Sequence, residues 1–179
     1  MHPDLRVTRI LWFGLFASTF AYVFVLAMQG QRICDFPPCG ADSPLLYGLG
    51  GGALSSAVAS VLLSRRLMRA ALPRTAPAIR EEQDPSQVQY RDRVTMRRLF
   101  ADPASARRSA IAAHKTPFIV GMALAESVAI YGLVLGLLGF PPANVAPFFA
   151  GCWILMACHF PRVAAIERAL EGVHRAKFE

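Results

Sequence analysis

The sequence has few charged residues, and this scarcity is its most informative feature. Only 17% of the 179 residues are Asp, Glu, Lys or Arg, against roughly 25% in a soluble domain, while 54% are hydrophobic. Long runs contain no charge at all, and arginines crowd the central segment. This pattern excludes an ordinary soluble domain and indicates an integral membrane protein. The net charge of +7 is therefore no argument for a nucleic-acid partner, and we expect none.

The chain also lacks the motifs of enzyme chemistry. Its polar central segment contains no phosphate-binding loop, no zinc-ligand pattern and no nucleophile elbow. Cysteine is scarce as well, and Cys34 and Cys39 flank an Asp-Phe-Pro-Pro sequence with no nearby His to complete a metal site. These two thiols either form a disulfide in an oxidising compartment or stay unpaired. We expect no enzyme activity, no cofactor and no metal.

Four hydrophobic segments are present, at 10–28, 44–64, 117–140 and 145–160. About 20 apolar residues at roughly 1.5 Å each cross the hydrocarbon of a bilayer, and only helices satisfy their own amides there. The sequence predicts an all-α integral membrane protein with four transmembrane helices. The first segment is read as retained, because its run is longer than the core of a signal peptide. The regions are 1–43, 44–64, 65–116, 117–140 and 145–179, of which 65–116 is a long polar loop.

The basic residues predict the orientation of these helices. Twelve Lys and Arg lie in the 65–116 loop, and others precede the first segment or follow the last, whereas Arg32 is the one basic residue between the first two segments. By the positive-inside rule, both termini and the loop are cytoplasmic. We expect the cytoplasmic membrane of a bacterium as the location.

The 65–116 loop changes in character along its length. Its first part contains three prolines and is expected to be irregular. Residues 86–100 mix apolar side chains with arginines and predict a basic amphipathic helix, and Asp102-Pro103 predicts the start of a second short helix. Two interpretations of the basic residues stay open. They bind anionic lipid, or they are basic only because the loop is cytoplasmic.

Small residues line the second and third hydrophobic segments. Gly48, Gly50 and Gly52 open the second, and Gly121 and Gly132 recur in the third. Such residues let two helix backbones approach closely, which is how helices associate where no hydrophobic effect separates them from lipid. We therefore expect these two helices to pack together.

Glu126 is the single carboxylate in the third segment, placed near the middle of the membrane. A charge there costs a few kcal/mol on insertion scales, so a partner or a function is expected. Ser55 and Ser56 lie at a similar depth, roughly 14 Å from the cytoplasmic end of their segment, and are the expected partners. Ser127 adds a neighbouring hydroxyl, and Tyr131 follows five residues later. Proton binding and simple interhelical hydrogen bonding are both consistent with this position.

The stretch from Gly121 to Leu135, with Ala-Glu126-Ser-Val-Ala-Ile-Tyr131-Gly132-Leu-Val, resembles the second helix of the rotor-ring c subunit of F-type ATP synthases. The alternating glycines at 48, 50 and 52 are similar to the start of that family's first helix. The resemblance implies that Glu126 carries a transported proton and that Tyr131 lies over it. The chain differs from the family in its 52-residue connector and in its additional first and fourth segments.

Two functions follow from these patterns. The first is a membrane subunit in which Glu126 binds and releases a proton, in a homo-oligomer or a larger membrane complex. The second is a scaffold or assembly subunit without transport, in which the glycine-lined helices pack on the helices of a partner.

Overall fold

A computed structural model of the chain describes residues 5–29, 44–83 and 96–178, and these residues are mostly helical. The predicted cysteine pair, Cys34 and Cys39, lies outside the described residues. The elements in chain order are α1 (Arg6–Gln29), α2 (Pro44–Ala71), the 3₁₀ turn η2 (Leu72–Arg74), β1 (Ile79–Gln83), β2 (Met96–Phe100), α3 (Pro103–Leu137), α4 (Pro142–Cys158) and α5 (Val163–His174).

Three helices, α1, α2 and α3, are long and apolar enough to cross a membrane. Helix α4 has 17 residues and is followed by α5 after a bend of 61°, so the two form a fourth crossing only if they are counted as one broken span. The prediction of several membrane-spanning helices is confirmed at this level.

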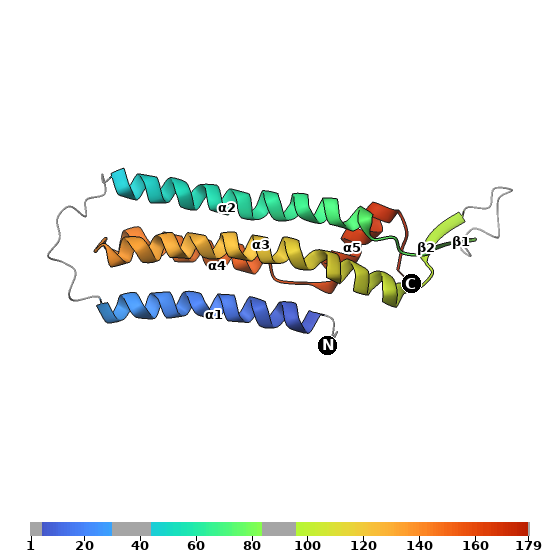
Figure 1. The fold of residues 1–179 in the computed structure, drawn as a ribbon, viewed down its shortest axis with the longest axis horizontal. Helices are drawn as coiled ribbons and strands as arrows, with labels where there is room; N and C mark the ends of the chain where they lie inside the picture. Colours follow the sequence, from blue (N-terminus) through green and yellow to red (C-terminus); the bar gives the residue numbers. More distant parts are fainter. Residues whose placement is uncertain (1–4, 30–43, 84–95, 179) are drawn as a thin grey trace, which may run out of the picture.

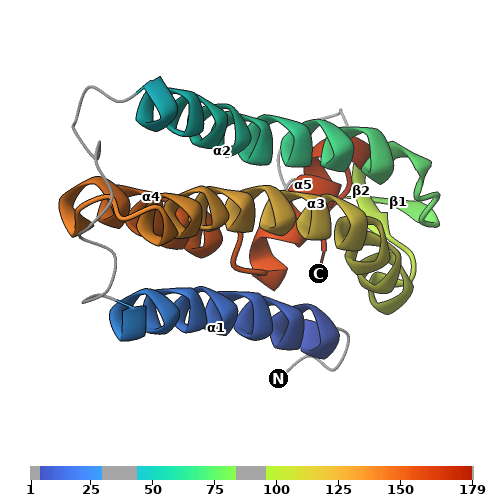
Figure 2. The ribbon, with the colours of Figure 1, turned by 60° about the vertical axis from the view of Figure 1, so that its left-hand side comes forward.

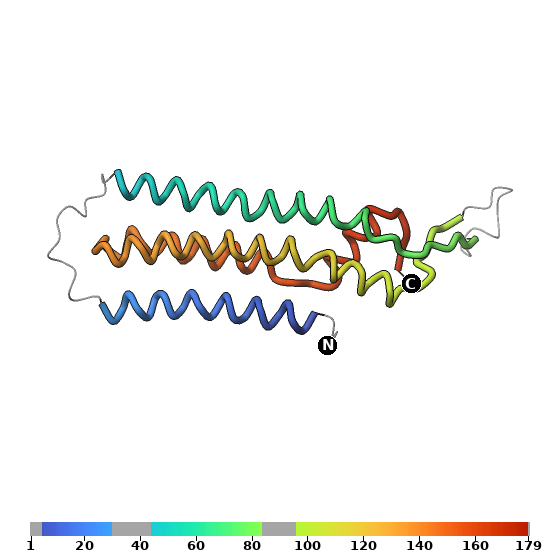
Figure 3. The backbone as a smooth tube through the Cα atoms, in the orientation of Figure 1, coloured from blue at the N-terminus to red at the C-terminus, as the bar shows by residue number. Residues whose placement is uncertain are grey.

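Helix α3 is the centre of the arrangement. Helix α2 lies along one side of α3 and α1 along the other, while α4 runs beside α3 (Figures 1 and 2). The tube in Figure 3 shows that α5, the two strands and the first turns of α3 gather at one end of the bundle, where the C-terminus also lies. We call this end the head.

The head has a hydrophobic core of its own, separate from the core between the long helices. Leu72, Phe100, Ile111, Ile166 and Leu170 are each at most 3% exposed and form its centre. The polar segment between the second and third spans is therefore largely folded where it is described.

The predicted amphipathic helix at 86–100 is wrong for its last five residues, which form the strand β2. This strand pairs antiparallel with β1, and the pairing places Glu81 opposite Arg98 and Glu82 opposite Arg97. Opposite charges across two strands stabilise each pair by a few tenths of a kcal/mol to about 1 kcal/mol. The arginines were interpreted as one face of a helix because their acidic partners lie about fifteen residues earlier in the chain. Residues 86–95 lie outside the described part.

The helix predicted to start at Asp102-Pro103 does start there, but it is the long helix α3 and not a short one. Asp102 is its N-cap, accepting a hydrogen bond from the Ser105 amide at 3.0 Å, and Pro103 occupies the first turn. The helix then continues through Pro117, which was expected to start a new span. A proline removes only one backbone donor, and buried neighbours hold the helix together, since Pro117 and Phe118 both lie in the core.

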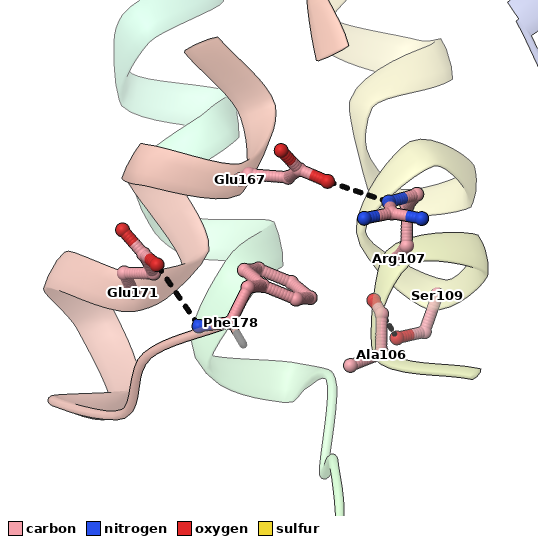
Figure 4. Close-up of polar contacts among 6 residues, drawn as sticks. All are labelled: Ala106, Arg107, Ser109, Glu167, Glu171 and Phe178. Atoms are coloured by element: carbon pink, nitrogen blue, oxygen red, sulfur yellow. Dashed lines mark hydrogen bonds and ion pairs between the residues drawn. The ribbon is translucent and has the colours of Figure 1, made fainter. Parts of the chain in front are cut away.

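The last residues of the chain pack onto the head. Lys177 exchanges backbone hydrogen bonds with β2, donating to the Arg98 carbonyl at 2.9 Å and accepting from the Phe100 amide at 3.3 Å. The ring of Phe178 lies 4.5 Å from that of Phe100. Figure 4 shows Phe178 between α5 and α3, with its amide held by Glu171 at 3.0 Å.

Candidate functional site

Glu126 is half-buried in α3, on the face that meets α1. Two hydroxyls of α1 reach one of its oxygens: Ser18 Oγ and Tyr22 OH each lie 2.9 Å from Glu126 Oε1. Ser18 and Tyr22 are four residues apart and therefore project from the same side of their helix, one turn above the other. The Glu126 carboxyl thus has a two-hydroxyl site on the neighbouring helix.

The Ser18 hydroxyl has two candidate acceptors but only one proton. Its oxygen lies 2.7 Å from the Leu15 carbonyl, which can only accept, and 2.9 Å from Glu126 Oε1. When the Ser18 proton points to Leu15, the contact with Glu126 requires a proton on the carboxyl. When it points to Glu126, the carboxyl accepts and no such proton is needed. The same heavy-atom geometry therefore fits both protonation states of Glu126.

Two indole hydrogen bonds join α1 to α4 near this site. The Trp12 indole donates to the Met156 carbonyl at 2.8 Å, and the Trp153 indole donates to Thr19 Oγ1 at 2.8 Å. Thr19 is fully buried. Stacked rings continue the contact, since Trp153 lies parallel to Phe20 with centroids 5.1 Å apart. The Glu126 site is therefore part of an interface with a defined register.

The structure does not bring the predicted α2 hydroxyls to Glu126. Ser55 is exposed and donates to the Gly52 carbonyl of its own helix at 2.8 Å. No contact joins Ser56 to the carboxyl in the described part of the chain, where the hydroxyls that reach Glu126 come from α1. Ser127 donates to the Leu124 carbonyl at 2.8 Å, again within its own helix. The depth argument therefore indicated the wrong helix for the hydroxyl partners.

Tyr131 points away from the carboxyl. A Cβ added at Gly52 would lie 3.2 Å from the Tyr131 ring, so the tyrosine packs on α2. Five residues of helix turn a side chain by about 140°, which separates the face of Glu126 from the face of Tyr131. Tyr22, from α1, is the tyrosine that contacts Glu126. Sequence reasoning missed Tyr22 and Ser18, although Ser18, Thr19 and Tyr22 interrupt an otherwise apolar segment.

The predicted packing glycines separate into two groups. Gly52, Gly121 and Gly132 lie against other helices: a Cβ added at Gly121 would come 2.5 Å from His159, and one at Gly132 would come 2.7 Å from Phe148. Ser60 of α2 also donates to the Gly121 carbonyl at 2.8 Å. In contrast, a Cβ at Gly48 or Gly50 would meet no atom within 4 Å. Those two glycines face outward from the described part of the chain.

The other candidate ligands do not assemble into a metal site in the described segments, 5–29, 44–83 and 96–178. No group of three His, Cys, Asp or Glu side chains comes together there. Cys152 is buried in α4, and Cys158 is exposed at the end of that helix.

Comparison with known proteins adds no relative: no family model, no curated protein and no solved structure matches the chain. The resemblance to the rotor c subunit therefore depends on the residues around Glu126 and on the alternating glycines at 48, 50 and 52.

Proposed function

We propose that the chain is a membrane subunit in which Glu126 binds and releases a proton at the interface of α1 and α3. The observation that supports this most is the pair of hydroxyls on one carboxyl oxygen, of which Ser18 has a second acceptor in reach. An intramembrane acid is costly unless its charge is compensated or removed, and this site offers both solutions. The basic head faces the cytoplasm by the positive-inside rule, and the bacterial cytoplasmic membrane is the proposed location.

The proposed cycle needs only rotations of hydroxyl groups. In the charged state, Ser18 and Tyr22 both donate to Glu126 Oε1. When a proton arrives at the carboxyl, Ser18 turns its own proton back to the Leu15 carbonyl, and the Ser18 oxygen accepts a hydrogen bond from the new carboxyl O–H. Release reverses these steps. No backbone movement is required, so the site can exchange a proton without loss of the α1 contact.

The resemblance to the rotor subunit supports the role of Glu126, but the residues around this carboxyl differ from those in that family. In that family a tyrosine of the same helix lies over the carboxylate, whereas in this chain Tyr22 of α1 contacts Glu126 and Tyr131 contacts Gly52. Helix α1 therefore covers the carboxyl. For translocation, the proton must pass α1, which makes this helix the element that controls access in our proposal.

Carbodiimide labelling and proton flux test the proposal. Glu126→Gln is expected to abolish labelling and flux in proteoliposomes of the purified protein. The double variant Ser18→Ala/Tyr22→Phe is expected to lower flux by about tenfold, because two hydrogen bonds to charged groups are lost. The matched control Ser127→Ala/Tyr131→Phe removes the same two groups from positions that do not contact Glu126, and its flux should change less than about twofold.

Two outcomes would contradict the proposal. Full flux in Glu126→Gln would refute proton carriage by this residue. A large effect of the control pair with no effect of Ser18→Ala/Tyr22→Phe would instead favour the arrangement implied by the rotor subunit, with Tyr131 over the carboxyl.

A scaffold is the second candidate, and the outward glycines favour it. Gly48, Gly50 and Gly51 are positions of α2 at which an added Cβ would meet no described atom within 4 Å. A partner helix or a second copy of the chain could approach there. In this case Gly50→Leu should reduce the size of the complex in mild detergent, while Glu126→Gln should leave it unchanged. Equal complex size in Gly50→Leu would exclude the side of α2 that carries Gly50 as the contact.

A further inference from the structure

A cavity of about 430 Å³ lies where α2, α3, α4 and α5 meet at the base of the head. Its polar lining consists of four basic side chains and a hydroxyl: Arg65, His114, His159, Arg162 and Ser64. No carboxylate of the described residues lines it. The rest of the wall is apolar. The cavity therefore combines positive charge with a hydrophobic surface.

The cavity lies at the boundary between apolar and basic sequence in three separate segments. Arg65 directly follows the apolar run of α2, His114 precedes the apolar run of α3 by three residues, and Arg162 lies four residues after the end of α4. Such boundaries mark the level of the lipid headgroups. The basic lining is thus at the depth where phosphate groups of the bilayer lie.

The bend between α4 and α5 adds positive potential to the same place. Arg162 is the N-cap of α5 and makes no side-chain capping bond, and Ala165 and Ile166 of the first turn line the cavity. Amides at a helix N-terminus carry a partial positive charge and favour anions.

Neither Arg65 nor Arg162 has an ion-pair partner among the residues that the structure describes. By contrast, Arg107 of the same head is paired with Glu167 (Figure 4). The two cavity arginines therefore have no counter-ion in the described part of the chain, and we take their charge to be available to an external anion.

His159 lines the cavity, and its contacts hold the imidazole ring in one orientation. Its Nδ1 lies 2.8 Å from the Leu155 carbonyl, which can only accept, so Nδ1 carries a proton. Its Nε2 lies 3.4 Å from Ser64 Oγ. The ring is seated against α3 at Gly121, where a side chain would collide with it.

We propose that this cavity binds one anionic phospholipid, with the phosphate between Arg65 and Arg162 and an acyl chain along Val61 and Phe118. A lipid is favoured over a soluble anion because the apolar wall and the membrane depth match an acyl chain below a phosphate. Basic pockets between helices on the cytoplasmic side suit such headgroups. The site is separate from Glu126 and does not depend on proton binding.

Native mass spectrometry of the full chain in detergent tests the site by titration with dioleoylphosphatidylglycerol. The double variant Arg65→Gln/Arg162→Gln is expected to weaken binding by about tenfold or more. The control Arg66→Gln/Arg168→Gln removes two neighbouring exposed arginines that do not line the cavity, and binding should change by less than about threefold. If the double variant does not fold, Arg65→Lys/Arg162→Lys keeps the charges and should retain binding. Loss of equal size in both Gln variants would overturn the proposal.

A second pair of variants distinguishes a cavity from general attraction to a basic surface. Ala165→Phe fills the cavity without a change of charge and should weaken binding by about tenfold, whereas Ala164→Phe, on the same exposed turn but outside the lining, should not. Unchanged binding in Ala165→Phe would refute an occupied cavity.

Two ligand controls complete the test. Dioleoylphosphatidylcholine should bind at least tenfold more weakly than phosphatidylglycerol, and excess inorganic phosphate should not displace the lipid. Equal binding of the neutral lipid, or displacement by phosphate, would contradict the proposal. Glu126→Gln should leave lipid binding unchanged, so failure here and failure of the proton proposal can be told apart.

Discussion

The two faces of α3 are built by different means. Towards α2, the contact is close and uses small residues: Ser60 donates to the Gly121 carbonyl, and the Tyr131 ring covers Gly52. Towards α1, the contact is polar and centres on Glu126 with two hydroxyls. Only 6% of the apolar window of α1 is buried, against 44% for α3. The apolar window of α2 is 11% buried, so the ionisable group faces the less buried of the two helices that flank α3.

The largest effect is expected at the α2 face of α3. Gly121→Leu should destabilise the protein by about 3 kcal/mol, because the new side chain would displace His159 and separate α2 from α3. The control Gly51→Leu adds the same side chain where no atom lies within 4 Å, and it should not destabilise the protein because leucine has a higher helix propensity than glycine. Unfolding in mixed dodecylmaltoside and dodecylsulfate micelles measures both. Equal stability of the two variants would contradict the close packing at Gly121.

A smaller effect is expected at the α1 face. Glu126→Leu removes the acceptor of Tyr22, while Ser18 keeps the Leu15 carbonyl, so the loss should be about 1 to 2 kcal/mol. Glu126→Gln keeps an acceptor oxygen and should cost about half as much.

The two tryptophans of the chain, Trp12 and Trp153, both lie between α1 and α4, so their fluorescence reports whether α1 is attached. A changed emission maximum is expected in Glu126→Leu and not in Ser127→Ala. Identical spectra would show that Glu126 does not help to hold α1.

The sequence predicted the membrane helices better than their contacts. Apolar runs located α1 and α2 well, because hydrocarbon permits few alternatives to a helix. The prediction of a helix start at Pro117 was wrong, because burial of the proline keeps α3 continuous. The prediction of a helix at β2 was wrong, because the acidic residues that pair with its arginines lie on another strand. The sequence also indicated α2 as the helix that supplies the hydroxyl partners of Glu126, because the depth of each residue was known and the rotation about the helix axis was not. The polar positions in α1 were visible, yet their partner could be found only from the packing.

A loss of stability smaller than at Glu126 is expected at the contact that holds α1 to α4. Trp153→Phe removes the indole hydrogen bond to the buried Thr19 and should cost about 1 kcal/mol. Thr19→Val should cost a similar amount, and the double variant should cost little more than either, since both lose the same bond. Helical circular dichroism during unfolding measures all three without the need for the tryptophan signal. Additive losses would show that this bond does not couple the two helices.

The smallest effect tests how tightly α2 approaches α3. A Cβ in Gly52→Ala would lie 3.2 Å from the Tyr131 ring, which must move by a few tenths of an ångström, whereas Gly50→Ala meets open space. Both variants gain about 0.5 to 1 kcal/mol of helix propensity. Gly50→Ala should therefore be stabilised, and Gly52→Ala should be close to neutral. In a Tyr131→Ala background the two should become equal, because the ring alone distinguishes them. If Gly52→Ala stabilises as much as Gly50→Ala with Tyr131 present, α2 and α3 are packed loosely enough at Gly52 to accept a methyl group. The contrast between the two faces of α3 is then smaller than the structure indicates.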